Sequence, residues 1–273
     1  MAYNFRSERI SASTIRIFTP TGESVYLVEG TRKAMLLDAG LGLGNLAEFV
    51  QSLTQKPLDL LVTHGHMDHS GGAAAFGKAY LNPKEIPLAE SHNNIESKKQ
   101  YAAFWLKGAA PDDRDFTGGV PEWLPLRGGD SFNLGKVTLV CRELPGHTAG
   151  IMTVLNREER SILLGDACNV LTMLVDQSAL PVEQYKAELL KFRAAYGDEF
   201  DRVLLSHGSG DAPKAVLDGV ISLCDDILAG NTDDLPFPFI DGVYTLAKAV
   251  NFSDMTRVDD GIGNIVYDKG RVR

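Results

Sequence analysis

The sequence has 273 residues, of which 44% are hydrophobic and 23% charged, and its formal net charge is −9. This length and composition are those of a globular protein that buries its core in one large domain, and no apolar run approaches the roughly 20 residues that cross a bilayer. The acidic charge argues against an extended nucleic-acid partner, because such binding depends on Lys and Arg that neutralise phosphates.

At the N-terminus, Met1 to Ile10 carries charged residues and lacks the apolar stretch and cleavage site of a signal peptide, so we expect a cytoplasmic protein. The cysteines are odd in number, widely separated and without the paired spacing of a thiolate zinc site. We therefore predict free thiols at Cys141, Cys168 and Cys224.

The first elements predicted along the chain form a β-then-α unit. Val25–Glu29 and Ala34–Leu37 are apolar runs typical of strands, and the second ends at the turn Asp38-Ala39-Gly40. The glycines at positions 40, 42 and 44 lack the spacing of a dinucleotide-binding turn and indicate a packing turn. A helix follows, because apolar residues recur at intervals of three and four. These residues are Leu46, Phe49, Val50 and Leu53.

A segment of different character, residues 83–129, is predicted to be an insertion over the site. It contains a polar helix followed by a loop rich in Pro and Gly. The helix carries Tyr101, Phe104 and Trp105 on one face. Such a face is more typical of packing than of a substrate-binding wall, and both interpretations stay open. His92, in a polar helical setting, is expected to lie outside any metal site.

Helical periodicity returns around Leu189–Phe192 and over Val216–Leu228, so strands and helices alternate along the chain and indicate an α/β protein. After residue 208 the sequence predicts a short C-terminal addition, with one amphipathic helix and a final strand at Asn264–Tyr267. Repeats and flexible linkers are absent from the sequence, so residues 1–273 are predicted to form one domain.

Four apolar strands are each followed directly by residues that can bind metal. Leu58–Thr63 precedes the sequence HGHMDH, and Val137–Leu144 precedes PGH. Ile162–Leu164 precedes GD, and Val203–Leu205 precedes SHG. Because a strand fixes the position of the loop that follows it, α/β proteins build their sites at such strand ends. The four motifs are therefore expected to supply one site.

The most specific signal is the concentration of histidines, since three of the six in the chain fall within six residues, with Asp68 between them. The pair His64-x-His66 can direct two imidazoles at one ion, while Asp68 and His69 point to a second position a few ångströms away. Imidazole and carboxylate ligands suit zinc, iron or manganese. The alternative without metal requires each of five histidines to follow a buried strand by accident.

In chain order, THGHMDHSGG, PGHTAG, LLGDA and SHG resemble the motifs of the metallo-β-lactamase superfamily, over about Val25–Gly208. The resemblance implies an αββα sandwich with a binuclear metal site, in which zinc is preferred to iron or manganese. It also implies that Asp166 and a hydroxide bridge the ions, and that Asp38 orients a ligand histidine. The implied ligands are His64, His66 and His147 for the first ion, and Asp68, His69 and His207 for the second.

Within this superfamily the chain is similar to glyoxalase II and the acyl-homoserine lactonases. This likeness implies hydrolysis of a small-molecule ester, thioester or lactone, with Asp68 and Asp166 as catalytic residues. His66 stands where the flavin-linked di-iron branch carries Glu, and true β-lactamases generally lack the aspartate found here as Asp166. Two alternatives stay open: a phosphodiesterase with the same pair of ions, and a metal-binding protein without catalytic activity.

Overall fold

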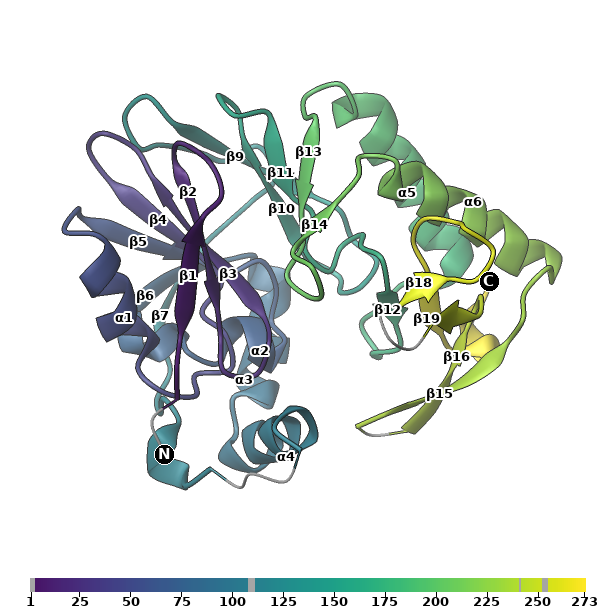
Figure 1. Cartoon of the computed structure of the whole chain (residues 1–273), viewed down its shortest axis with the longest axis horizontal. Coiled ribbons are helices and arrows are strands. Elements are labelled where there is room, and N and C mark those ends of the chain that lie inside the picture. Colours follow the sequence, from purple (N-terminus) through teal and green to yellow (C-terminus); the bar gives the residue numbers. More distant parts are fainter. Residues whose placement is uncertain (1–2, 108–110, 241, 252–254) are drawn as a thin grey trace.

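The computed structural model describes residues 3–107, 111–240, 242–251 and 255–273. Two β-sheets pack face to face and helices cover both outer faces, so the layers run helix, sheet, sheet, helix (Figure 1). The predicted αββα sandwich is thus confirmed. The layers stack because each one hides its apolar face against its neighbour. Within the described residues, no helix combines the length and the apolar content that crossing a membrane requires.

The two large sheets contain most of the strands. In spatial order, the first sheet consists of β1 (Arg6–Arg9), β2 (Thr14–Phe18), β3 (Ser24–Glu29), β4 (Ala34–Leu37), β5 (Leu58–Leu61), β6 (Lys78–Leu81) and β7 (Glu122–Pro125). The second consists of β14 (Asp211–Ala212), β13 (Arg202–Leu204), β11 (Ser161–Leu163), β10 (Met152–Asn156), β9 (Thr138–Glu143) and β8 (Ser131–Asn133). Short helical turns also occur at α2 (Met67–Ser70), η1 (Ala73–Phe76) and η4 (Lys269–Arg271).

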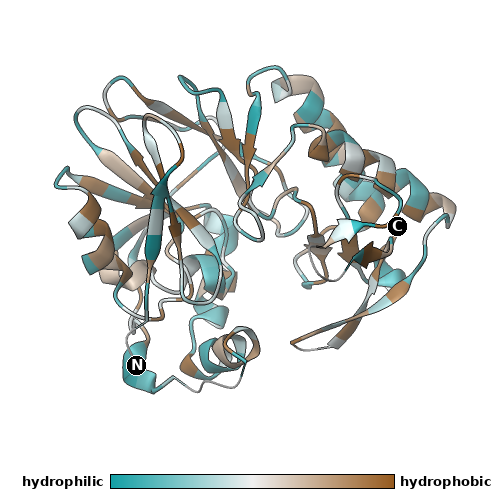
Figure 2. Cartoon of the chain, in the orientation of Figure 1, coloured by the Kyte–Doolittle hydropathy of each residue, from teal (hydrophilic) through white to brown (hydrophobic). Residues whose placement is uncertain are grey.

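Successive residues of a strand face opposite sides of the sheet, and β4 supplies both sides of the first sheet. Met35 and Leu37 belong to the core between the sheets, while Leu36 faces the outer helix layer. There α1 (Leu46–Leu53) covers the sheet with Leu46 and Val50, as its periodicity predicted. Figure 2 shows apolar and polar residues mixed along the strands and along the helices.

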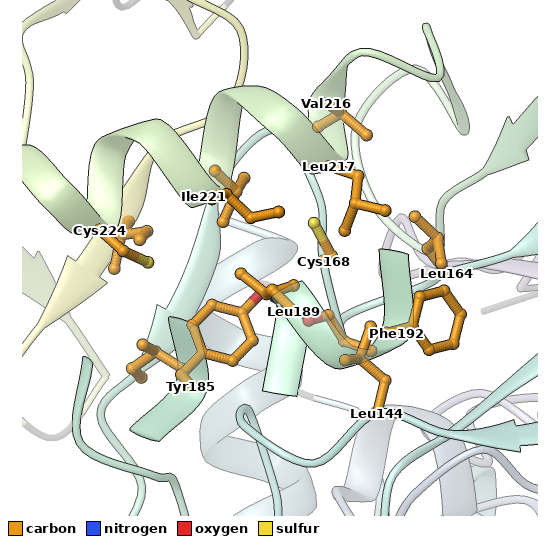
Figure 3. Close-up of a cluster of buried hydrophobic side chains, with 14 of the residues drawn as sticks. Leu144, Leu164, Cys168, Tyr185, Leu189, Phe192, Val216, Leu217, Ile221 and Cys224 are labelled. Carbon is orange, nitrogen blue, oxygen red and sulfur yellow. Dashed lines mark hydrogen bonds between the residues drawn. The ribbon is translucent and has the colours of Figure 1, made fainter. Parts of the chain in front are cut away.

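The outer face of the second sheet is covered by α5 (Val182–Tyr196) and α6 (Val216–Ala229), which pack against each other. Figure 3 shows the buried cluster in which these two helices pack against residues at and after the strand ends of the second sheet, such as Leu144, Leu164 and Cys168. Tyr185 donates its hydroxyl to the carbonyl of Ala167 at 2.7 Å. Cys168 is fully buried, which raises the pKa of its thiol to about 12. All three cysteines are unpaired, as predicted, and all three are buried.

The C-terminal residues form more structure than the predicted helix and strand. A third sheet contains β12 (Thr172–Leu174), β19 (Ile265–Tyr267), β16 (Gly242–Leu246) and β15 (Leu235–Phe239), and β17 (Val250–Asn251) pairs with β18 (Thr256–Arg257). The predicted final strand is confirmed as β19. β15 gave no strand signal because Pro236 and Pro238 interrupt it, and proline is confined to edge strands such as this one. Residue 208 is not a structural boundary, since β13 and β14 pair across it.

Residues 83–129 include both a helical segment and one strand of the first sheet. The helical segment consists of η2 (Pro83–Glu85), α3 (Ile86–His92), α4 (Ile95–Trp105) and η3 (Asp113–Asp115). Residues 122–125, in contrast, form β7, which pairs in parallel with β6 at the edge of the first sheet. The predicted insertion therefore ends before residue 129, because prolines at an edge strand imitate a loop. Residues 108–110 of this segment lie outside the described residues.

The four strands predicted to precede metal-binding motifs are confirmed as β5, β9, β11 and β13, with ends shifted by one or two residues. In the second sheet, β9, β11 and β13 run in the same direction, because β10 is antiparallel to its two neighbours and β11 is parallel to β13. Their C-terminal ends consequently lie at one edge of the sheet. His147, Asp166 and His207 follow these ends, and the motif after β5 reaches them from the first sheet.

Candidate metal centre

The motif after β5 is held in place by the turn at Asp38, whose φ of 67° is a left-handed conformation that Asp tolerates better than most residues. Oδ1 of Asp38 accepts the backbone N–H of Thr63 at 2.7 Å, and Oδ2 accepts the Thr63 hydroxyl at 3.0 Å. Oδ2 also lies 2.8 Å from Nδ1 of His69, which donates to it. The family resemblance implied a contact between Asp38 and a ligand histidine; the contact with His69 is present, and the ligand role of His69 stays a prediction.

The glycine turn that follows Asp38 packs against the same motif. Gly42 has a φ of 82°, and a Cβ atom at this position would lie 2.6 Å from the carbonyl oxygen of Gly71. Only glycine permits both the left-handed backbone and this close approach. The turn is therefore a packing turn, as predicted.

Three histidines from two loops converge in the tri-histidine cluster, which consists of His64, His66 and His147. Nδ1 of His66 lies 3.1 Å from Nε2 of His64 and 2.9 Å from Nε2 of His147. The opposite ring nitrogens are bound elsewhere: Nδ1 of His64 lies 3.0 Å from the Thr63 hydroxyl, and Nδ1 of His147 donates to the carbonyl of Met173 at 2.6 Å. These outer partners leave the lone pairs of His64 and His147 facing into the cluster.

This arrangement fits a metal ion. Lone pairs that face one another at such distances repel unless a cation lies between them. Nitrogens bound to a tetrahedral zinc ion at about 2.0–2.1 Å lie roughly 3.3 Å from one another, close to the separations in the tri-histidine cluster. The side chains present are therefore of the type and spacing that such an ion needs.

A second cluster lies beside the first and consists of Asp68, His69, Asp166 and His207. Nε2 of His69 is 3.5 Å from Oδ2 of Asp68 and 3.2 Å from Oδ2 of Asp166. Nε2 of His207 is 3.4 Å and 3.2 Å from the same two oxygens. One potential ligand atom of each residue thus lies within 4.8 Å of the others. Asp68 and His69 belong to the short helix α2, and Asp166 and His207 belong to loops that follow strands β11 and β13.

Asp166 belongs to the second cluster and also lies close to the tri-histidine cluster. Besides its contacts in the second cluster, its Oδ2 is 3.8 Å from Nε2 of His147 and 4.0 Å from Nε2 of His64. Its Oδ1 is buried without a hydrogen-bond partner. A buried polar atom without a partner is costly, and a cation would satisfy this oxygen.

The structure therefore brings together every residue that the sequence singled out as a ligand. Their individual roles toward a metal stay predictions. The set comprises His64, His66, Asp68, His69, His147, Asp166 and His207.

Three further side chains reach these clusters without having been predicted there. His92 was expected outside the site, but its ring stacks on His66 with centroids 5.3 Å apart and planes at 12°. Asp176 places Oδ2 3.8 Å from Nε2 of His66. Tyr101 donates its hydroxyl to Oδ2 of Asp68 at 2.9 Å. These contacts join loops and helices that are far apart in the sequence, so no local motif could predict them.

The two clusters differ in their electrostatics. Burial and the neighbouring rings lower the pKa of His64 well below its usual value, and burial lowers that of His147 to about 4. Burial acts in the same direction on His69 and His207, but nearby carboxylates, among them Asp166, outweigh it and raise the pKa of both rings well above its usual value. Without metal, these shifts favour the doubly protonated, charged form of His69 and His207 and the neutral form, with a single N–H, of His64 and His147.

A metal ion that binds the second cluster through His69 and His207 would have to displace the extra protons of these two rings. We therefore expect its affinity to fall as the pH falls below the raised pKa values, by about tenfold per pH unit for each displaced proton. His64 and His147 have no proton to lose in this range. Calorimetric titration with zinc in two buffers of different ionisation heat counts the released protons, and His207→Ala should release fewer than the wild type. Equal release from both proteins would contradict the prediction.

Comparison with known proteins finds one family and several individual proteins that are similar to this chain in sequence. A sequence model of the metallo-beta-lactamase superfamily matches residues 18–207. The chain is 28% identical over 164 residues to the acyl-coenzyme A thioesterase MBLAC2 of Bos taurus, covering 52% of this chain and 57% of the relative. It is 26% identical over 160 residues to a hydroxyacylglutathione hydrolase of Bdellovibrio bacteriovorus, covering 56% of this chain and 50% of the relative. The chain thus spans about half the length of these curated relatives.

Solved structures share the fold at lower identity. The metallo-beta-lactamase from Pontibacter korlensis aligns with a TM-score of 0.62 and 16% identity, over 80% of this chain and 98% of that one. The sec-alkylsulfatase Pisa1 from Pseudomonas sp. aligns with a TM-score of 0.63 and 14% identity, over 85% of this chain and 44% of that one. At such identities the likeness shows the fold alone.

Proposed function

The chain belongs to the metallo-beta-lactamase superfamily, and from this membership we propose that it is a binuclear metal-dependent hydrolase of a small-molecule ester, thioester or lactone. The observation that carries the proposal is the position of Asp166, whose Oδ2 lies within 4.0 Å of four histidine nitrogens drawn from both clusters. The tri-histidine cluster would hold one divalent ion and the second cluster another. Zinc is our first choice, because imidazole and carboxylate ligands suit it.

Two such ions, when bound, lower the pKa of a shared water toward neutrality and polarise the carbonyl oxygen of the substrate. The remaining tasks belong to side chains of this protein. Asp166 joins the two clusters and supplies negative charge between them. We assign proton transfer to Asp68, which would receive the proton of the attacking water and return it to the leaving oxygen or sulfur. The hydroxyl of Tyr101, which donates to Asp68, holds that carboxylate in one orientation.

The charges around the clusters favour an uncharged carbonyl over a phosphodiester. A phosphodiester is anionic before attack and benefits from Arg or Lys beside the metal. Among the described residues, the ion pairs of the two clusters are all between histidine and aspartate. In the segment over the site, Lys98 donates to backbone carbonyls, while Lys99 and Arg114 pair with aspartates of the same segment.

An aromatic series leads from Asp68 to the surface and suits an apolar acyl group. The ring of Tyr101 lies 6.1 Å from that of Trp105, which lies 5.3 Å from Phe104. Phe104 in turn lies 5.8 Å from Phe239 at the end of β15, so α4 meets the β15–β16 hairpin there (Figure 1). Phe104 and Trp105 are 47% and 44% exposed, more than packing alone requires. An acyl group on this surface also fits the name acyl-coenzyme A thioesterase carried by relatives.

A hydrolysis panel of thioesters, carboxylic esters, lactones and phosphodiesters tests this function on protein of verified metal content. We expect kcat/KM for the best carbonyl substrate to exceed that for every phosphodiester by at least about tenfold, a difference of roughly 1.4 kcal/mol in transition-state stabilisation. It should also rise about threefold to fourfold for each methylene of the acyl chain that is buried.

Two results would contradict this proposed function. A phosphodiester turned over ten times more efficiently than every carbonyl substrate would favour the phosphodiesterase. Protein that carries two metal ions per chain and hydrolyses nothing in the panel would favour a metal-binding protein without catalytic activity.

A further inference from the structure

A single buried carboxylate connects the two loops that carry the tri-histidine cluster. Glu85 ends the short helix η2 and is 1% exposed. Its Oε2 accepts the backbone N–H of Gly65 at 2.8 Å, and its Oε1 accepts that of Gly150 at 2.5 Å. Gly65 lies between His64 and His66, and Gly150 lies three residues after His147. One side chain thus binds both loops at once.

A second side chain of the same segment holds Gly150 from the other side. Nδ2 of the buried Asn82 donates to the carbonyl of Gly150 at 2.9 Å, while its Oδ1 accepts the backbone N–H of Lys84 at 3.1 Å. The residue Gly150 is therefore fixed through both its N–H and its C=O. Two hydrogen bonds on one residue restrict how far the His147 loop can move relative to η2.

Close packing reinforces these hydrogen bonds. A Cβ atom on Gly65 would lie 2.6 Å from the carbonyl oxygen of Glu85, and one on Gly150 would lie 2.9 Å from Nδ2 of Asn82. Both loops therefore touch the segment from Asn82 to Glu85 through backbone that has no side chain in between. The distance between the loops is set by a common support rather than by contact between the histidines alone.

We propose that Glu85 is a positioning residue for the tri-histidine cluster, and the proposal rests on the metal-binding function proposed above. By accepting one N–H from each loop, its carboxylate fixes the separation of the His64–His66 pair from His147. Only a carboxylate presents two acceptor oxygens to these two donors, because a glutamine amide would turn its NH2 group toward one of the N–H groups. Positioned ligands bind metal more tightly because less ordering is required on binding.

The test is cobalt binding to Glu85→Gln. The measurement is made in a His207→Ala background, which restricts tight binding to the tri-histidine cluster. We expect Glu85→Gln to weaken the affinity for cobalt by about 10-fold to 100-fold, the range found for groups that orient ligands. The visible absorption bands of the bound cobalt should also change, because they report the geometry of its ligands.

Glu159→Gln is the matched control. Glu159 is likewise a carboxylate that accepts a backbone N–H, from Ser13 at 2.8 Å, but it connects the start of β2 to the turn between β10 and β11 and not to the ligand loops. If Glu85→Gln lowers the melting temperature as Glu159→Gln does but keeps the cobalt affinity and spectrum of its parent, Glu85 has a purely structural role and the proposal fails.

Two further outcomes complete the design. If Glu85→Gln does not fold, Asn82→Ala releases the same Gly150 residue from the other side, and unchanged cobalt affinity in that variant would overturn the proposal. If the parent itself binds no cobalt, the metal-binding function fails together with the role of Glu85. A parent that binds cobalt while the variants match it overturns the role of Glu85 alone.

Discussion

Asp166→Ala is expected to leave the protein folded and to abolish most of its turnover, with kcat/KM falling by on the order of 10³-fold. The reason is the central position of Oδ2, which lies 3.2 Å from nitrogens of His69 and His207 and faces His64 and His147 as well. In the proposed binuclear site, removing it would take a shared ligand from two dications and would leave their mutual repulsion without the intervening negative charge. The measurement is steady-state kinetics on protein whose metal content is determined alongside.

Asp166→Asn separates charge from ligand number. The amide oxygen still coordinates but carries no charge, so both metal retention and turnover should lie between those of the wild type and Asp166→Ala. Asp201→Ala is a suitable control, because Asp201 is exposed and pairs with Arg160 at the surface. Wild-type activity and metal content in Asp166→Ala would remove Asp166 from the site.

His147→Ala and His207→Ala are expected to lose different ions. His147 contributes to the tri-histidine cluster alone, and His207 to the second cluster alone, although both lie near Asp166. Each variant should therefore retain close to one ion per chain and bind the other at least about 100-fold more weakly, a larger loss than that caused by an orienting group. Elemental analysis after dialysis against a weak chelator gives the count.

Each of these variants serves as the control for the other, because both remove one imidazole from the same region of the fold. Cobalt spectra distinguish the ion that remains, since the tri-histidine cluster offers only nitrogen while the second cluster also offers carboxylate oxygen. Equal loss of both ions in each variant would show that the two clusters do not act as separate sites.

Local sequence was sufficient to predict those helices and strands that carry periodic apolar residues. The helix α1 and the strands β3 and β4 were predicted with nearly correct ends, because side-chain spacing is a property of a few neighbouring residues. The same approach failed for β1, whose residues are all exposed and show no alternation. It also failed for β15, where two prolines imitate a loop.

For the site, the sequence by itself determined the chemical types of the proposed ligands and the strands that deliver them, because both can be read within short motifs. The family resemblance implied how these residues divide into two groups, but only the tertiary structure shows the distances within each group and the side chains that surround them. His66 and His147 are 81 positions apart, yet their ring nitrogens lie 2.9 Å apart because two sheets pack with their strand ends at a common edge. Tyr101, His92 and Glu85 join the site for the same reason, since contacts across layers depend on the packing of whole elements.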